Sequence, residues 1–142
     1  PAFKEVPNVG YAASPAVLVA KGDAIRRFSR AIVKASLLVR TNAAAAARML
    51  LTADGAPFTG ADLARATAEL TAWQSDLPAA EPNNRRIGAL SVQGLQRYSE
   101  LLAEAGVTKT VIPATEVVTG DFIAFANNFD HTALKKMAKS LP

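Results

Sequence analysis

The chain has 142 residues, of which 50% are hydrophobic and 20% are charged, a balance that is typical of a globular protein rather than a disordered one. It has no cysteine, which excludes disulfide bonds, thiolate metal ligands and a cysteine nucleophile. The net charge of +4 is only a weak indication of an anionic partner, so scattered surface lysines and arginines are the favoured interpretation. No apolar run approaches ~18 residues, and the first residues show no signal-peptide pattern.

The first twenty residues predict a loop followed by a strand. Two prolines and a glycine punctuate the start, and proline pushes the residue before it toward extended geometry. Residues 16–20, AVLVA, are apolar on both alternating faces, which predicts a buried, central and parallel strand. A single strand cannot satisfy its backbone hydrogen bonds, so partner strands are expected from residues 1–12 or from protein outside this chain.

The next segment has the strongest periodic pattern in the chain. From Asp23 onward, apolar residues recur in steps of three and four, which predicts an amphipathic helix with one buried stripe. That stripe comprises Ile25, Phe28, Ile32, Ala35 and Val39. The other side is basic, and we expect it to be solvated unless it contacts phosphate or docks on an acidic partner. Its residues are Arg26, Arg27, Arg30 and Lys34.

Five consecutive alanines, Ala43–Ala47, distinguish the segment that follows. They are consistent with a low-complexity spacer, but a flexible linker would instead carry glycine, serine or proline. Alanine has the highest helix propensity, and Asn42 before the run is a good N-cap. Met49–Leu51 gives the far end apolar side chains to bury. These features predict a helix over residues 42–53 that packs where another element approaches closely.

Four further helices are expected downstream. Residues 61–76 have the amphipathic period, and another such helix runs from the Ser91 cap to the Gly106 stop. Residues 107–118 are expected to form a loop with a short extended piece. Two short closing helices are expected within residues 119–129 and 130–141. Their expected buried anchors are Phe122, Phe125 and Phe129.

The sequence offers little chemistry for catalysis or metal binding. His131 is the only histidine, and it is expected in the first turn of a surface helix. Glu100 and Glu104 lie one turn apart, opposite the apolar side of their helix, so a solvated surface is favoured over acid–base catalysis. No zinc, calcium, dinucleotide, Walker A or GxSxG motif is present. We therefore expect no enzyme, no metal site and no cofactor.

Three longer stretches follow one another in an order that resembles a known pattern. SPAVLVAKGDAIRRFSRAIVKASLLVRTNAAAAARMLL reads as a strand, a basic helix and an Asn-capped, alanine-rich helix. GALSVQGLQRYSELLAEAGV and IPATEVVTGDFI follow it. Together they resemble the C-terminal half of ABC-transporter substrate-binding proteins of the nitrate, sulfonate, taurine and thiamine-precursor class. That family has proline where this chain has Ala43, and the resemblance, over about residues 10–126, rests on order and spacing.

The resemblance implies an α/β chain, the C-terminal part of a two-lobed periplasmic-binding-protein fold of type II-like form. Residues 1–142 would be that portion, predominantly helical with one or two strands. Residues 1–20 would supply a cleft-edge loop and a returning strand, and residues 22–142 would supply helices that pack on the first lobe. The implied function is to bind a small solute in the periplasm and deliver it to the membrane permease of an ABC-type importer. A sulfonate, nitrate or a pyrimidine would be the ligand, with no cofactor and no nucleic acid.

Gly10, Tyr11 and Ser14 are the candidate ligand-binding residues. They lie in a loop of small residues before the expected strand, and such loops often line ligand clefts, although a plain connection remains the alternative. Tyr11 is expected to stack on or hydrogen-bond a ligand, and Ser14 to donate to an anion. Two other functions compete with solute binding. One is a helical interaction or regulatory domain that contacts nucleic acid through residues 26–34, and the weaker is an enzyme that shares the binding-protein fold.

Overall fold

The computed structural model describes residues 10–53, 55–76 and 86–142, and every regular element within them is a helix. The helices are α1 Pro15–Ala20, α2 Gly22–Thr41, α3 Ala43–Ala53, α4 Gly60–Asp76, α5 Val92–Glu104, α6 Ala114–Val117, α7 Ile123–Asn127 and α8 His131–Ser140. The segments with a helical period are therefore confirmed as helices. The expected loop at 107–118 is wrong in part, because α6 forms there.

The α/β fold class is wrong for the part of the chain that the structure describes. Residues 16–20, the expected strand, lie in α1. The Ser14 hydroxyl caps this helix by accepting a hydrogen bond from the Val17 amide at 3.4 Å. Pro15 occupies the first turn, where its fixed φ suits a helix and its missing N–H costs nothing. These two start signals outweigh the strand preference of the valines. Of residues 1–12, where a partner strand was expected, residues 10–12 form no strand and residues 1–9 lie outside the described residues.

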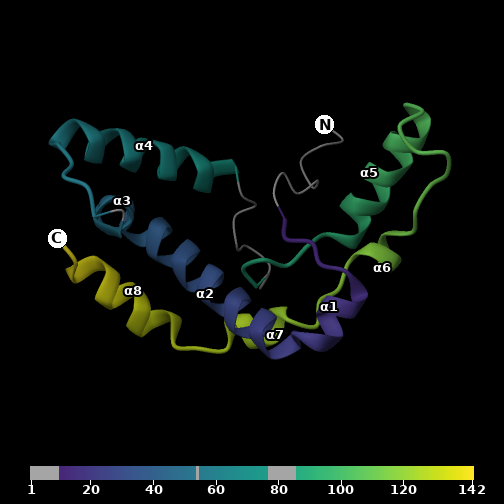
Figure 1. Ribbon diagram of the computed structural model, residues 1–142, viewed down its shortest axis with the longest axis horizontal. Coiled ribbons are helices and arrows are strands. Elements are labelled where there is room, and N and C mark those ends of the chain that lie inside the picture. Colours follow the sequence, from purple (N-terminus) through teal and green to yellow (C-terminus); the bar gives the residue numbers. More distant parts are fainter. Residues whose placement is uncertain (1–9, 54, 77–85) are drawn as a thin grey trace.

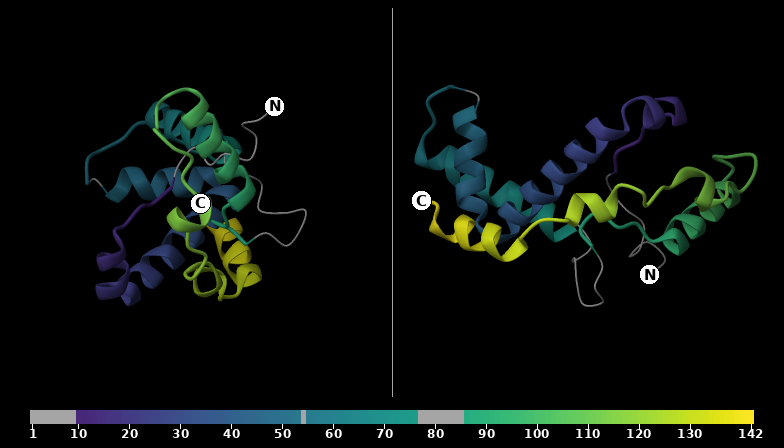
Figure 2. Two further views of the ribbon diagram at one scale, coloured as in Figure 1. Left: turned by 90° about the vertical axis from the view of Figure 1, so that its right-hand side faces the viewer. Right: turned by 90° about the horizontal axis from the view of Figure 1, so that it is seen from below.

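The long helix α2 is the centre of the molecule (Figure 1). α8 runs alongside it and α7 packs near its N-terminal end, while α3 and α4 pack at its C-terminal end. On the other side of the molecule, α5 packs chiefly against the short α6. The right-hand view of Figure 2 shows the same open arrangement from below, with the α5–α6 pair well separated from α3 and α8.

Small side chains form most of the buried interior. The buried apolar residues are Val33, Leu37, Ala45, Ala46, Ala47, Ala66, Ala114, Ala126 and Ala138. Because alanine extends no further than its Cβ, the helices that carry these residues approach one another closely. The prediction that the alanine run is packing material is confirmed, since Ala47 has no exposed surface.

The buried side of α2 is not the predicted one. Val33, Ser36 and Leu37 are buried, whereas Phe28 is 47% exposed and Ala35 is exposed. The helical period predicted the helix correctly, but none of the five residues of the predicted stripe is buried, and the covered face lies partly on the basic side of the helix. The reason is the contact between that basic side and the phenylalanines around α7.

Candidate functional site

The candidate residues Gly10, Tyr11 and Ser14 lie at the start of the described chain, and all three are exposed. Ser14 uses its hydroxyl as the cap of α1, so it already accepts one hydrogen bond. A Cβ added at Gly10 would meet nothing within 4 Å, so the structure shows no close neighbour there. The three residues therefore share a loop but do not line a common cavity, and their role as ligand contacts stays a prediction.

Tyr11 forms the one ring pair in this region of the described chain. Its ring meets Phe28 of α2 edge to face, with 5.0 Å between the ring centroids and 89° between the ring planes. Tyr11 is 70% exposed, and Val17 and Val19 of α1 are exposed as well. An exposed aromatic pair is a surface on which an apolar or planar ligand packs favourably. The sequence did not reveal this pairing, because Phe28 was expected inside.

A second feature joins the basic side of α2 to the segment around α7. Arg26 lies over the Phe122 ring at 5.9 Å, Arg30 over the Phe125 ring at 3.7 Å and Lys34 over the Phe129 ring at 5.3 Å, each measured to the ring centroid. We call these three pairs the cation–aromatic row. The cations are four residues apart on α2, so they share one helix face, while the rings are spaced three and four apart.

Arg30 makes the closest contact in the cation–aromatic row. Besides stacking on Phe125, its Nε and Nη2 donate to the Phe125 carbonyl oxygen at 3.1 and 2.9 Å. Arginine suits this position because its planar guanidinium stacks on a ring and still donates hydrogen bonds within its own plane. The expected solvated basic face is therefore wrong for Arg30, and Phe125 is a half-buried anchor rather than a fully buried one.

The end of α7 is tied to the chain that precedes α5. The Asn127 amide donates to the Ile87 carbonyl at 3.0 Å and accepts from the Ile87 amide at 3.1 Å. His131 begins α8, as expected for the first turn, and stacks on Phe129 with 4.3 Å between the ring centroids. Its Nε2 lies 3.1 Å from the Asn127 carbonyl. These contacts give His131 a structural role at the start of α8.

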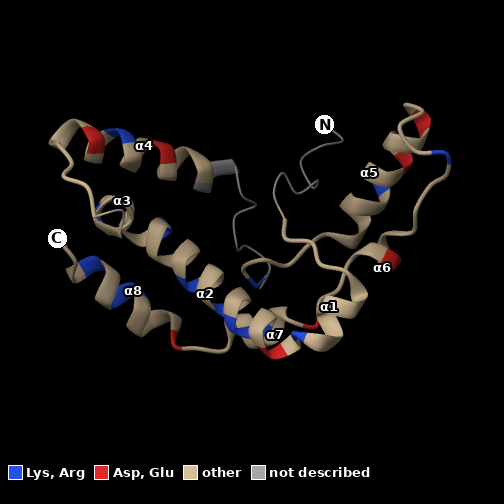
Figure 3. Ribbon diagram, viewed as in Figure 1, with Lys and Arg blue, Asp and Glu red and all other residues tan. Residues whose placement is uncertain are grey.

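The charges are unevenly distributed among the helices (Figure 3). α2, α3 and α8 together carry nine lysines and arginines and one aspartate, a net charge of +8. α4, α5 and α6 carry two arginines and six acidic residues, a net charge of −4. The overall charge of +4 thus conceals a basic part and an acidic part.

The acidic helices form local pairs rather than a reactive site. On α5, Arg97 bridges Glu100 at 2.9 Å and Glu104 at 3.2 Å, and these carboxylates raise the pKa of Arg97. On α4, hydrogen bonds from the Thr59 backbone and hydroxyl lower the pKa of Asp62 below its usual value. Glu100 and Glu104 therefore lie on a surface with an arginine between them, as the sequence indicated.

Two classes of site find no support in the residues that the structure describes. No group of three or more histidines and carboxylates is placed to hold a metal ion within the described ranges. None of the described helices is both long and apolar enough to cross a membrane. Comparison of the chain with protein-family models, curated proteins and solved structures finds no match.

Proposed function

We propose that this chain is a helical portion of a solute-binding protein that captures a small molecule in the periplasm for an ABC-type importer. The observation that carries the proposal is the exposed pair of Tyr11 and Phe28 beside the predicted ligand loop. Such a pair offers one ring face and one ring edge to a planar or anionic solute. The order of the helical segments that resemble the C-terminal half of these proteins supports the same function, although the strand that opens that pattern is replaced here by α1.

The amount of exposed surface supports the view that these helices pack on further protein. The chain has an accessible surface of 9729 Å², whereas a compact monomer of this length has roughly 7000 Å². The exposed large side chains include Val19, Val107 and Val117, each at least 65% exposed. Large apolar side chains left exposed are expected on a chain that further protein covers.

The nucleic-acid alternative is less well supported. It requires the basic face of residues 26–34 to be available, yet Arg30 stacks on Phe125 and donates to its carbonyl oxygen. A cation of the same chain lies over one face of each ring in the cation–aromatic row, so that face is not open for stacking on bases. A binding function for a small solute is therefore the better proposal, with no catalytic role.

Calorimetric titration tests the proposal with the protein at the full length that its gene encodes. The titrants are an alkyl sulfonate, nitrate and a pyrimidine, the three ligand classes that the resemblance implies. We expect one of them to bind, and Tyr11→Ala to weaken that binding at least tenfold because the ring contact is lost.

Tyr98→Ala is the matched control, because Tyr98 is also exposed but lies on α5. It should leave the affinity unchanged. An affinity that Tyr11→Ala leaves unchanged would show that Tyr11 does not contact the ligand. Absence of binding by all three classes, together with a salt-sensitive gel shift with DNA, would favour the nucleic-acid alternative.

A further inference from the structure

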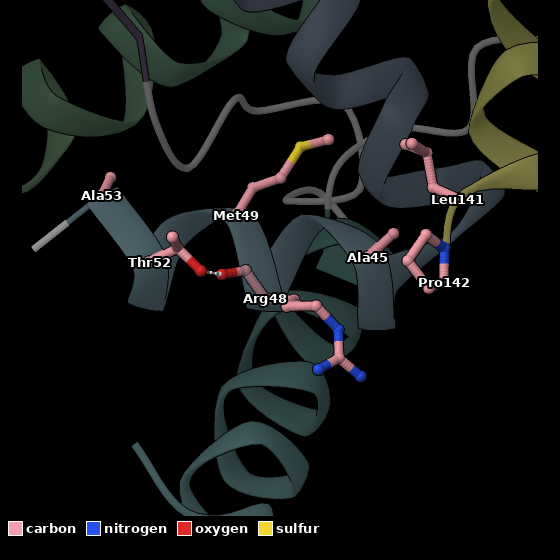
Figure 4. Close-up of a pocket in the computed structure, with 7 residues that line it drawn as sticks. All are labelled: Ala45, Arg48, Met49, Thr52, Ala53, Leu141 and Pro142. Carbon is pink, nitrogen blue, oxygen red and sulfur yellow. Dashed lines mark hydrogen bonds between the residues drawn. The ribbon is translucent and has the colours of Figure 1, made fainter. Parts of the chain in front are cut away.

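A pocket at the other end of α2 is lined by one face of α3 and by the residues after α8 (Figure 4). It has a volume of about 420 Å³, within the range of roughly 300–1000 Å³ that small-molecule sites occupy. The lining residues are Ala45, Arg48, Met49, Thr52, Ala53, Leu141 and Pro142. The five from α3 are spaced three, one, three and one apart, so they share one face of the helix.

Asn42 creates this pocket by fixing the end of α8 beside the start of α3. Its side-chain oxygen caps α3 by accepting from the Ala45 amide at 3.0 Å. Its side-chain nitrogen donates to the carbonyls of Ala138 at 3.0 Å and Leu141 at 3.2 Å. One amide therefore positions both walls, and the small side chains of Ala45 and Ala53 leave the space between them open.

The lining combines apolar walls with a single cation. Ala45 is buried, and Met49 and Leu141 add flexible apolar side chains that adapt to the shape of a bound group. Arg48 is exposed, and no ion pair links it to an acidic residue in the described parts of the chain. The Thr52 hydroxyl already donates to the Arg48 carbonyl at 2.7 Å. The pocket surface itself is almost entirely apolar, and the Arg48 guanidinium lies at its edge, extending away from Met49 and Leu141 (Figure 4).

From this geometry we propose that the pocket binds a small amphiphilic anion, namely a carboxylate or sulfonate that carries an aliphatic or aromatic group. The apolar group packs against Met49, Leu141 and the alanines, and the acid group receives two parallel hydrogen bonds from the Arg48 guanidinium. An uncharged ligand with only the apolar group leaves the Arg48 cation unpaired. An inorganic anion leaves the apolar walls of the pocket without a contact. Both should therefore bind more weakly.

The pocket is separate from the solute site proposed above. Phe28, which contacts Tyr11, and Asn42, which holds the pocket together, are fourteen residues apart along α2 and its C-cap. At ~1.5 Å per residue that separation is roughly 20 Å. The pocket is therefore a second site. Its ligand can be tested independently of the function proposed for the loop that carries Tyr11.

The test uses 1-naphthalenesulfonate as the probe, with naphthalene-1-methanol and sulfate as the uncharged and tail-free comparisons. Binding to the full-length protein is measured by calorimetry and by ¹H–¹⁵N chemical-shift changes. We expect the sulfonate to bind at least tenfold more tightly than either comparison, with the largest shifts in residues 45–53 and 141. Shifts confined to other regions, or equal affinity for the uncharged probe, would overturn the proposal.

Two substitutions locate the site. Arg48→Gln should lower the affinity for the probe at least tenfold. Arg65→Gln on α4 changes an exposed arginine outside the pocket and should leave that affinity unchanged. Ala53→Trp fills the pocket from an exposed position and should block the probe even with Arg48 intact. Unchanged affinity in Arg48→Gln or in a folded Ala53→Trp would contradict the proposal. Tyr11→Ala should leave the affinity for the probe unchanged. A lower affinity in that variant would show that the probe binds at the proposed solute site instead.

Discussion

The helices around α2 and the arm formed by α5 and α6 are built in different ways. α2 packs against α3, α4, α7 and α8, and most of the buried residues of the described chain lie in these helices. In the arm, only Gly94 and Ala114 are buried. The arm is instead held by side-chain bonds to the backbone, with Ser99 accepting from the Ile112 amide at 2.7 Å and Gln96 from the Ala114 amide at 2.9 Å.

This difference separates what local sequence determines from what packing determines. The arm has good local signals, with Ser91 capping α5 and Gly106 in the left-handed conformation at its end. These signals form the helix, but they bury little surface and therefore add little global stability. The α2 region gains its stability from close helix contacts and from the cation–aromatic row. We expect the arm to open more readily than the α2 region unless further protein covers it.

The substitution with the largest expected effect on stability lies in the cation–aromatic row. Arg30→Ala removes the stack on Phe125 and two hydrogen bonds to its carbonyl oxygen. We expect the free energy of unfolding to fall by about 3 kcal/mol. Urea denaturation followed by circular dichroism measures the change. Arg27→Ala, which removes an exposed arginine from the same helix, should change it by less than about 0.5 kcal/mol. Equal effects of the two would show that the row does not stabilise the α2 region.

The next effect concerns the residue that joins α3 to α8. Asn42→Ala removes the cap of α3 and both bonds to the end of α8, and should lower the free energy of unfolding by about 2 kcal/mol. Asn42→Ser keeps a capping oxygen but cannot reach α8, so it should recover about half of the loss. Thermal unfolding of the three proteins provides the measurement. Full recovery by serine would mean that the bonds to α8 contribute nothing.

A smaller effect is expected in the arm. Gly106 has φ of 71°, so a side chain there is strained by about 1 kcal/mol. Gly106→Ala should speed amide hydrogen exchange in α5 and leave exchange in α2 unchanged. Gly60→Ala is the control, because its φ is not positive and an added Cβ meets nothing within 4 Å. Faster exchange in both α5 and α2 of the Gly106→Ala protein would show that the arm and the α2 region open together.

The smallest effect is a pH dependence at the start of α4. The Thr59 hydrogen bonds lower the pKa of Asp62 in the folded chain, so the carboxylate stabilises α4 above its unfolded pKa of about 3.9. That contribution is lost as the pH falls through the lower folded pKa. Asp62→Asn should therefore destabilise α4 more at pH 7 than at pH 2. Exchange rates in α4 at the two pH values provide the measurement, and an equal effect at both would contradict this assignment.

The sequence predicted where the helices lie better than it predicted which sides they bury. Local signals such as Asn42 before the alanines, Ser91 and Gly106 place helix ends correctly, because capping depends on neighbouring residues alone. The strand expected at residues 16–20 was wrong because the Ser14 cap and Pro15 start a helix there, and these local signals outweigh the strand preference of the valines.

Contacts between distant residues were beyond the reach of the sequence pattern. The periodicity of α2 separates an apolar side from a basic side, but it does not reveal that phenylalanines some 95 residues later cover the basic side. The candidate loop was singled out by its position, and its pairing with Phe28 was missed because that residue was expected inside. The pocket at α3 was missed as well, since only its α3 face, with alanines flanking Arg48, is visible in the sequence.

The central claim is that the α2 region is a packed unit and that the α5–α6 arm is not. Native-state hydrogen exchange over the whole chain tests it most directly, because each amide reports the free energy of the opening that exposes it. We expect the slowest amides in residues 33–47 and exchange at least a hundredfold faster in residues 92–104. Equally slow exchange in both ranges would contradict the account.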